Sequence, residues 1–293
     1  MDQPTTTTVQ VDGGALFVRD IGSGPPILAL HGGPDFDHAY LLPELDRLAG
    51  QFRLVYYDQR GRGRSFHGEG PDDVTMESEM DDADRVRAWT RSDTVALLGH
   101  SWGGLLAMEY AIRHPDRVSH VVLIDTAPAS HQDMLELRRH LRSLRSPEQL
   151  ARMGELASDP AFLTGDPDAT AEYNRIHFAP TIHRSQDLDM VVARFYTAST
   201  PQGIVAAREI EESLYAQTWS NEAYDLFPSL RELRIPTLVI RGEHDFIPES
   251  VSRRIAASLQ PSRFVAILDA GHFAFVEQPE MVRSAIAEFL APA

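Results

Sequence analysis

Short, continuous apolar runs alternate along the chain with longer segments whose apolar residues recur every three or four positions. A run of about five apolar residues is typical of a strand buried on both faces, and the longer spacing is typical of a helix. The alternation therefore predicts βαβ units and a parallel sheet. The predicted strands are 26–30, 53–57, 95–98, 120–124, 236–240 and 264–268, and the predicted helices are 41–48, 75–89, 102–113, 248–259 and 279–290.

Two further strand-like segments open the chain at residues 8–11 and 15–21. The turn-forming sequence Asp12-Gly13-Gly14 joins them, which predicts an antiparallel hairpin. The threonine run that begins at residue 5 is expected to be a frayed tail. With the hairpin, the pattern predicts a mostly parallel, eight-stranded sheet flanked by helices.

Between Pro128 and Pro228 the alternation stops. This region has no clear strand run, and it is polar and helix-prone. We interpret residues 129–227 as a helical cap that is inserted after the sixth strand. Residues 1–128 and 228–293 are then expected to form the α/β core.

The acidic composition and the absence of cysteine narrow the functional classes. Asp and Glu outnumber Lys and Arg by 43 to 27, and the formal net charge of −16 argues against nucleic acid or an anionic membrane as a partner. The lack of cysteine excludes disulfides, thiol nucleophiles and cysteine-ligated metals. The histidines at 131, 140, 177 and 183 show no ligand spacing, so we predict no metal and no cofactor.

The start of the chain lacks the basic region and the apolar core of a signal peptide. In addition, no apolar run approaches the roughly 20 residues that span a bilayer. A cytoplasmic protein is therefore expected.

The segment LLGHSWGGLL at 97–106 carries the first candidate for chemistry. A strand run precedes Ser101, a helical run follows it, and Gly99 and Gly103 stand two positions to either side. Glycines at these positions let the chain turn sharply from strand to helix, so that the serine is exposed at the C-terminal end of the strand. Because this context is typical of a nucleophile elbow, we predict that Ser101 is a nucleophile.

A serine hydroxyl needs a base that accepts its proton and an acid that orients the base. In the nucleophile-elbow fold, these residues follow in the order serine, acid, histidine. Asp245 and His272 come after the last two predicted strands, at the edge of the sheet where Ser101 lies, and we predict them as acid and base. Asp125, which follows the strand 120–124, is a rival acid, and Glu243 is a weaker one.

Backbone N–H groups near Ser101 are expected to stabilise an oxyanion, because they are fixed in place before the negative charge develops. One is expected from Trp102, the residue after the nucleophile. The other is expected from the loop His31-Gly32-Gly33-Pro34, in which we select Gly33.

Three segments of the chain resemble those of α/β-hydrolases and, more narrowly, of the proline iminopeptidase group of serine peptidases. They are HGGP at 31–34, YDQRGRGRS at 57–65 and GHSWGG at 99–104. The resemblance covers the core on both sides of the insertion, and it implies the α/β-hydrolase fold. It also implies that residues 31–34 form an oxyanion loop, that residues 57–65 form a structural loop beside it, and that residues 99–104 form the nucleophile elbow. Asp35 departs from the family pattern, which usually continues HGGP with glycine.

The same resemblance implies a serine hydrolase with an acyl-enzyme intermediate, and an aminopeptidase that releases N-terminal residues from small peptides. In the family, a glutamate of the cap helps to hold the free amine of the substrate. For this role we select Glu209 and Glu212, which share a face of a predicted helix at i and i+3. Trp219 is a further candidate for the pocket.

The core motifs leave a second function open, a carboxylesterase or lactonase acting on small acyl substrates, because the acyl-enzyme chemistry is the same. A non-catalytic binding protein is disfavoured by the intact series of serine, acid and histidine. A dehalogenase or epoxide hydrolase is disfavoured because those enzymes carry aspartate where Ser101 stands. A small molecule or a short peptide is the expected partner.

Overall fold

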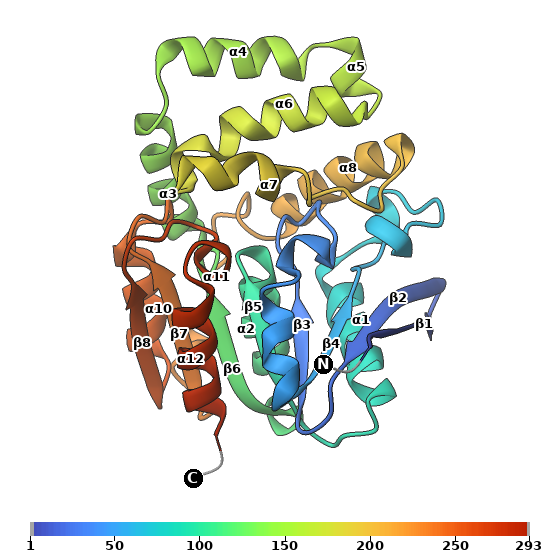
Figure 1. Ribbon diagram of the computed structural model, residues 1–293, viewed down its shortest axis with the longest axis vertical. Coiled ribbons are helices and arrows are strands. Elements are labelled where there is room, and N and C mark those ends of the chain that lie inside the picture. The colour runs from blue at the N-terminus through green and yellow to red at the C-terminus, as the bar shows by residue number, and fades with distance from the viewer. Residues whose placement is uncertain (1–2, 292–293) are drawn as a thin grey trace.

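The computed structural model describes residues 3–291 and contains an eight-stranded sheet (Figure 1). Across the sheet the strands lie in the order β1-β2-β4-β3-β5-β6-β7-β8. β1 and β2 are antiparallel, β2 is antiparallel to β4, and the strands from β3 to β8 run parallel to one another. The predicted fold class is confirmed. The strands are β1 (Thr5–Val11), β2 (Gly14–Ile21), β3 (Pro26–Leu30), β4 (Arg53–Tyr57), β5 (Val95–His100), β6 (Val118–Ile124), β7 (Thr237–Gly242) and β8 (Ser262–Ile267).

Two local predictions are wrong. The threonine run is not a tail, because β1 begins at Thr5, which pairs with Asp20 of β2. Threonine is β-branched and suits a strand, so the run extends the hairpin. The predicted helix at 41–48 is interrupted by Pro43, which lacks an N–H for helical hydrogen bonding. Two 3₁₀ turns form instead, at His38–Leu41 and Leu45–Gly50.

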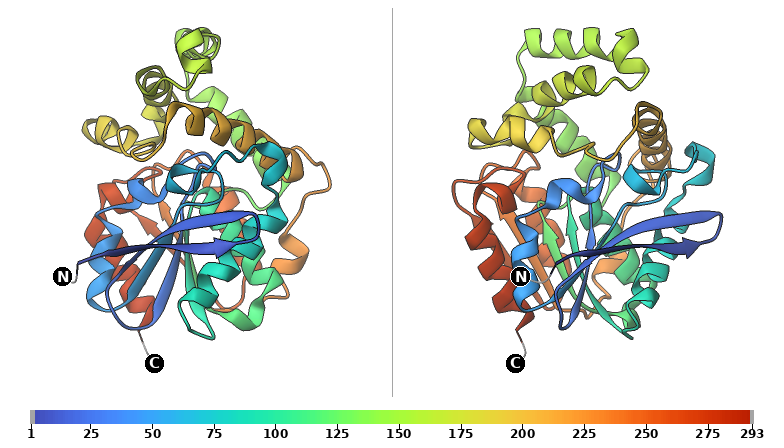
Figure 2. Two further views of the ribbon diagram at one scale, coloured as in Figure 1. Left: turned by 90° about the vertical axis from the view of Figure 1, so that its right-hand side faces the viewer. Right: turned by 45° about the vertical axis from the view of Figure 1, so that its right-hand side comes forward.

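Helices cover both faces of the sheet (Figure 2). Alternate residues of β3 belong to the two opposite hydrophobic layers, with Leu28 and Leu30 in one and Ile27 and Ala29 in the other. Burial on both faces explains why the strands are continuous apolar runs. Within residues 3–291, no helix combines the length and the apolar character needed to cross a bilayer. The first layer includes α1 (Met76–Trp89), α2 (Trp102–Arg113) and α10 (Glu249–Ser258), and the second includes α11 (Ala274–Glu277) and α12 (Pro279–Leu290).

The segment between β6 and β7 forms a set of helices above the C-terminal edge of the parallel strands (Figure 1). Local sequence fixes where several of them begin. Ser146, Asp166 and Thr200 each precede a proline, and each side chain accepts a hydrogen bond from the backbone N–H three residues later. The helices above the edge are α3 (His131–Ser143), α4 (Pro147–Ala157), α5 (Pro160–Leu163), α6 (Pro167–Phe178), α7 (Leu188–Val192) and α8 (Pro201–Gln217). The short helix α9 (Phe227–Leu230), at the end of the segment, packs instead against α2 and α10 beside the sheet.

Candidate active site

Ser101 occupies the sharp turn between β5 and α2. Its backbone has φ of 53° and ψ of −118°, a conformation that is strained for a residue with a Cβ. A Cβ added to Gly99 would lie 2.1 Å from the carbonyl oxygen of Gly103. A Cβ added to Gly103 would lie 2.0 Å from the carbonyl oxygen of Leu30. Glycine at both positions therefore lets β3, β5 and α2 approach closely enough to hold the serine in this turn.

Asp245 and His272 form a hydrogen-bonded pair in the loops that follow β7 and β8. His272 Nδ1 lies 2.8 Å from Asp245 Oδ1, and both side chains are buried. Because a carboxylate accepts hydrogen bonds, Nδ1 carries the proton and Nε2 is left as an acceptor. The backbone N–H of Ile247 also donates to Asp245 Oδ1, at 3.2 Å, and the ring of Phe246 packs 4.4 Å from the imidazole centroid. These contacts fix the orientation of the histidine.

Asp125, the rival acid, is engaged by backbone amides. Its Oδ1 accepts from the N–H of Gly242 at 2.7 Å, and its Oδ2 accepts from the N–H of Ala274 at 3.3 Å. Burial, and in second place the charge of Asp245, raise the pKa of Asp125 well above its usual range. The contacts of Asp125 join β7 to α11, which is a structural role, whereas Asp245 contacts the imidazole.

A chain of hydrogen bonds connects the HGGP loop to the backbone of His272. The Gly32 N–H donates to the Tyr40 hydroxyl at 2.6 Å, and this hydroxyl lies 2.7 Å from His100 Nδ1. His100 Nε2 lies 2.8 Å from the carbonyl oxygen of His272 and therefore donates to it. Burial lowers the pKa of His100 well below its usual range, so His100 stays neutral. His100 is thus a rigid link in the structure.

The HGGP loop lies against Ser101. A Cβ added to Gly32 would lie 3.1 Å from the Cβ of Ser101. Gly33 has φ of 121°, and a Cβ there would lie 2.3 Å from the backbone nitrogen of Asp35, so the position requires glycine. Trp102 is the first residue of α2, and its N–H has no acceptor in the preceding turn. Gly33, Ser101 and Trp102 line one cavity.

This cavity has a volume of about 420 Å³ and is lined by residues of the core and of the segment between β6 and β7. It contains Ser101 and His272, and it also includes Trp219. Trp219 is buried, and its Nε1–H donates to the carbonyl oxygen of Pro128 at 2.9 Å. The volume suits a small ligand, and the largely aromatic wall favours an apolar or ring-shaped group. The aromatic residues of the lining are Phe36, Trp102, Phe162, Tyr173, Phe178, Tyr196, Tyr215, Trp219, Phe246 and Phe273.

Two half-buried carboxyl groups, Asp35 from the loop after β3 and Glu211 from α8, line the same cavity. The Tyr196 hydroxyl donates to Asp35, and Tyr215 lies beside Glu211, where it acts to lower the pKa of that carboxyl against the effect of burial. Burial raises the pKa of Asp35. Burial, and then the charge of Asp35, raise the pKa of Glu211 to about 8. The pair therefore carries less than two negative charges at neutral pH, and a cation between the groups would relieve their repulsion.

The structure places the predicted acidic residues of α8 differently. Both residues are exposed, but Glu212 lines the cavity and Glu209 lies outside the lining. A helix turns about 100° per residue, so Glu209 and Glu211 point about 160° apart. The buried residues Ile210 and Leu214 fix the rotation of α8. The i, i+3 spacing shows which glutamates share a face, but the apolar stripe decides which face meets the cavity, and Glu211 lies next to that stripe.

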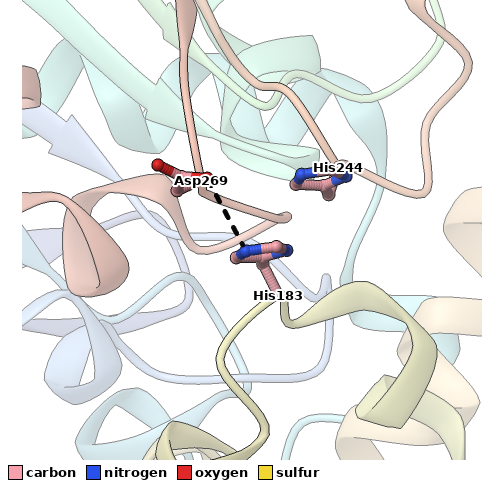
Figure 3. Close-up of side chains that lie close together, drawn as sticks. All are labelled: His183, His244 and Asp269. Atoms are coloured by element: carbon pink, nitrogen blue, oxygen red, sulfur yellow. Dashed lines mark ion pairs between the residues drawn. The ribbon is translucent and has the colours of Figure 1, made fainter.

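In the described part of the chain, two groups of three side chains offer metal-ligating atoms close together. The first group is Asp37, His38 and Asp58, which are buried, and the second is His183, His244 and Asp269, which are exposed (Figure 3). In the first group, Asp58 Oδ1 accepts from the backbone N–H of His38 at 3.1 Å, and Asp58 Oδ2 accepts from that of Arg64 at 2.9 Å. The oxygens of Asp58 are thus engaged within the fold, and the first group is structural.

Residues 25–279 match the family model of the alpha/beta hydrolase fold. The chain belongs to the α/β-hydrolase family. This α/β-hydrolase is 27% identical over 288 residues to proline iminopeptidase PfmaB of Pestalotiopsis fici, an alignment that covers 96% of this chain and 98% of the relative. It is a hydrolytic enzyme, as the family and such relatives show.

Two solved structures have similar folds over nearly the whole chain. One is a thermophilic esterase from Thermogutta terrifontis, with 26% identity, a TM-score of 0.70 and coverage of 99% of this chain and 98% of the other. The other is proline iminopeptidase of Mycobacterium smegmatis, with 23% identity, a TM-score of 0.72 and coverage of 98% and 97%. The α/β-hydrolase therefore has both peptidases and esterases among the proteins that it resembles.

Proposed function

We propose that this α/β-hydrolase is a serine aminopeptidase of the proline iminopeptidase type, which releases N-terminal residues from small peptides. The observation that carries the proposal is the pair of carboxyl groups, Asp35 and Glu211, in the cavity that contains Ser101. The N-terminal ammonium of a peptide supplies the positive charge that the pair attracts. The aromatic wall suits a ring such as that of proline. The curated relatives named proline iminopeptidase support the same assignment.

In the proposed acylation step, Ser101 Oγ attacks the carbonyl carbon of the first residue, and His272 Nε2 accepts the hydroxyl proton. Asp245 holds the imidazole in the tautomer that leaves Nε2 free. The N–H groups of Gly33 and Trp102 stabilise the oxyanion. His272 then gives the proton to the leaving amine as the carbon–nitrogen bond breaks, which leaves an acyl-enzyme ester.

In the proposed deacylation step, a water molecule attacks the ester carbonyl while His272 accepts a proton from it. The bond to Ser101 Oγ breaks, the proton returns to that oxygen, and the free amino acid leaves. Residues 129–227 act in this scheme as a cap that excludes water and sets specificity, while 1–128 and 228–293 carry the catalytic groups.

A comparison of three substrates tests the proposal: proline anilide with a free amine, the same anilide with an acetylated amine, and a short acyl nitrophenyl ester. We expect kcat/KM for the free amine to exceed that for the acetylated anilide by about tenfold or more, because an ammonium–carboxylate contact is a charge-assisted hydrogen bond. Ser101→Ala is expected to abolish turnover of all three substrates. Equal or faster cleavage of the acetylated anilide would contradict the peptidase assignment, and turnover by Ser101→Ala would contradict the nucleophile.

A carboxylesterase or lactonase is the second candidate function, and one observation favours it. With the pKa of Glu211 raised to about 8, the carboxyl pair is partly protonated at neutral pH, and a partly neutral cavity also accepts an uncharged acyl group. The similarity to the esterase of Thermogutta terrifontis points the same way. Rapid turnover of the nitrophenyl ester together with slow turnover of both anilides would establish this alternative.

A further inference from the structure

We propose that His183, His244 and Asp269 form a binding site for a divalent transition-metal ion of the zinc type. One ligand atom from each side chain lies within 4.8 Å of the other two. The two imidazole rings are stacked with centroids 4.2 Å apart and planes inclined by 7°, and His183 Nε2 lies 4.0 Å from Asp269 Oδ1 (Figure 3). The three residues come from distant segments of the chain, so sequence spacing does not reveal them.

The three side chains are free to bind an ion from solvent. The exposed fraction of the side chain is 36% for His183, 46% for His244 and 75% for Asp269. Among residues 3–291, no other group forms a hydrogen bond with any of these side chains. In contrast, the buried group around Asp58 has its oxygens bound to backbone amides. The surface group therefore offers ligand atoms that no hydrogen bond of the described fold occupies.

Backbone contacts hold the three segments together. The His244 N–H donates to the carbonyl oxygen of Ala270 at 2.8 Å, which joins the loops after β7 and β8. Asp269 has φ of 53°, and its N–H donates to Glu243 Oε2 at 3.3 Å. This left-handed conformation is tolerated by aspartate and asparagine better than by most residues. The loops thus present His244 and Asp269 on one surface before any ion arrives.

The segment that carries His183 is packed equally closely. A Cβ added to Gly271 would lie 2.2 Å from the carbonyl oxygen of Thr181 and 3.0 Å from the backbone nitrogen of His183. The same carbonyl oxygen accepts from the N–H of His272 at 2.7 Å. The three ligands therefore rest on a backbone framework that already joins the cap segment to the core.

Two imidazoles and one carboxylate are a ligand set that suits zinc and its neighbours in the first transition series. In a tetrahedral zinc site the donor atoms are about 3.3 Å apart, so the ligands close by small side-chain rotations. Solvent water fills the fourth position. Glu243 Oε2, at 3.6 Å from His244 Nε2, adds a carboxylate beside the ligands. The net charge of −16 favours cation binding in general.

A bound ion would connect the segment after α6 to the two loops that carry Asp245 and His272. His244 directly precedes Asp245, and Asp269 lies three positions before His272. The ion would therefore act as a clamp between the cap and the core at the edge of the active site. We expect it to stabilise the fold and to hold the imidazole–carboxylate pair in place, without contact with the substrate.

Titration of chelator-treated protein with ZnCl₂, followed by calorimetry, tests the proposal directly and does not depend on the substrate. We expect one ion per chain and an increase in Tm of a few degrees at saturating zinc. His183→Gln, His244→Gln and Asp269→Asn should each weaken zinc binding by at least about tenfold. His140→Gln is the matched control, since His140 is a partly exposed histidine of α3 outside both ligand groups.

Cobalt provides a second readout, because tetrahedral Co²⁺ absorbs visible light far more strongly than the hydrated ion. We expect this absorption in the wild-type chain and in His140→Gln, and not in His183→Gln with His244→Gln. Circular dichroism of the metal-free variants checks that they fold. Saturable zinc binding that survives the double substitution, or the absence of saturable binding in the folded wild-type chain, would overturn the proposal. The proposed peptidase activity can fail without affecting either result.

Discussion

Two pairs of neighbouring carboxyl groups in the α/β-hydrolase differ in what surrounds them. Asp125 and Asp245 lie in the core, where backbone amides and the imidazole of His272 bind their oxygens. Asp35 and Glu211 lie in the cavity, where the Tyr196 hydroxyl donates to Asp35 and Tyr215 lies beside Glu211. In both pairs, burial and a like charge raise the pKa of one member. The core pair is held by hydrogen bonds from the protein itself, whereas the cavity pair lines a space that a ligand can enter, together with Arg138 and Arg208.

The largest expected effect separates the two members of the core pair. Asp245→Asn should lower kcat by about 10³- to 10⁴-fold, because the substitution disturbs the tautomer of His272. Asp125→Asn should lower kcat by less than about tenfold but reduce stability by about 1–3 kcal/mol, since its amide NH₂ would face a backbone donor. Steady-state kinetics and denaturant unfolding of both variants measure the difference. A crippled but stable Asp125→Asn enzyme would show that Asp125 is the catalytic acid.

The second effect concerns the cavity pair. Glu211→Gln should reduce kcat/KM for a free-amine anilide by about 10- to 100-fold, because the ammonium loses a charge-assisted contact. The acetylated anilide should be cleaved at an unchanged rate. Glu209→Gln is the matched control, since Glu209 is on the same helix but outside the cavity lining. Equal losses on both anilides would mean that Glu211 shapes the cavity and does not bind the amine.

The smallest effect is on stability, and its sign follows from proton binding. The pKa of Glu211 is raised from 4.5 to about 8, so between these values the folded chain binds more protons than the unfolded chain. The contribution of Glu211 to stability therefore falls as pH rises through this window. Glutamine cannot ionise, so Glu211→Gln does not lose stability as pH rises and should be more stable than wild type by about 1–2 kcal/mol at pH 8.5. This expected gain is smaller than the full pKa shift implies, because the Glu211 side chain is half exposed. Thermal unfolding at pH 5 and pH 8.5 measures this, and a constant difference between the two would exclude ionisation of Glu211 as its cause.

The elements of the core could be predicted because each is specified by local sequence. The strands are apolar runs, and the turn at Ser101 needs Gly99 and Gly103 as immediate neighbours, so both are readable without tertiary information. The placement of Asp245 and His272 follows from parallel topology, which brings the C-terminal strand ends to one edge. These features are properties of short segments or of strand direction.

The cavity could not be predicted in the same way. Glu211 faces it because Ile210 and Leu214 pack into the core and set the rotation of α8, which depends on contacts with distant residues. Asp35 was visible only as a departure from a family pattern, and its pairing with Glu211 requires the cap to fold back over the core. The cluster of His183, His244 and Asp269 likewise depends on three segments meeting in space.

The raised pKa of Glu211 makes ligand entry a proton-exchange reaction. At neutral pH a cation that settles between Asp35 and Glu211 favours the ionised carboxylate, so a proton leaves for the solvent as the ligand arrives. The apparent affinity for an amine must then rise with pH up to about 8, until the amine itself begins to lose its charge. Binding heats measured in phosphate and in Tris should differ by the difference between the ionisation enthalpies of the two buffers, multiplied by the fraction of a proton released. Under the proposed function, the cavity would thus couple the binding of substrate to pH, and its selectivity for amines would vary with the pH of the medium.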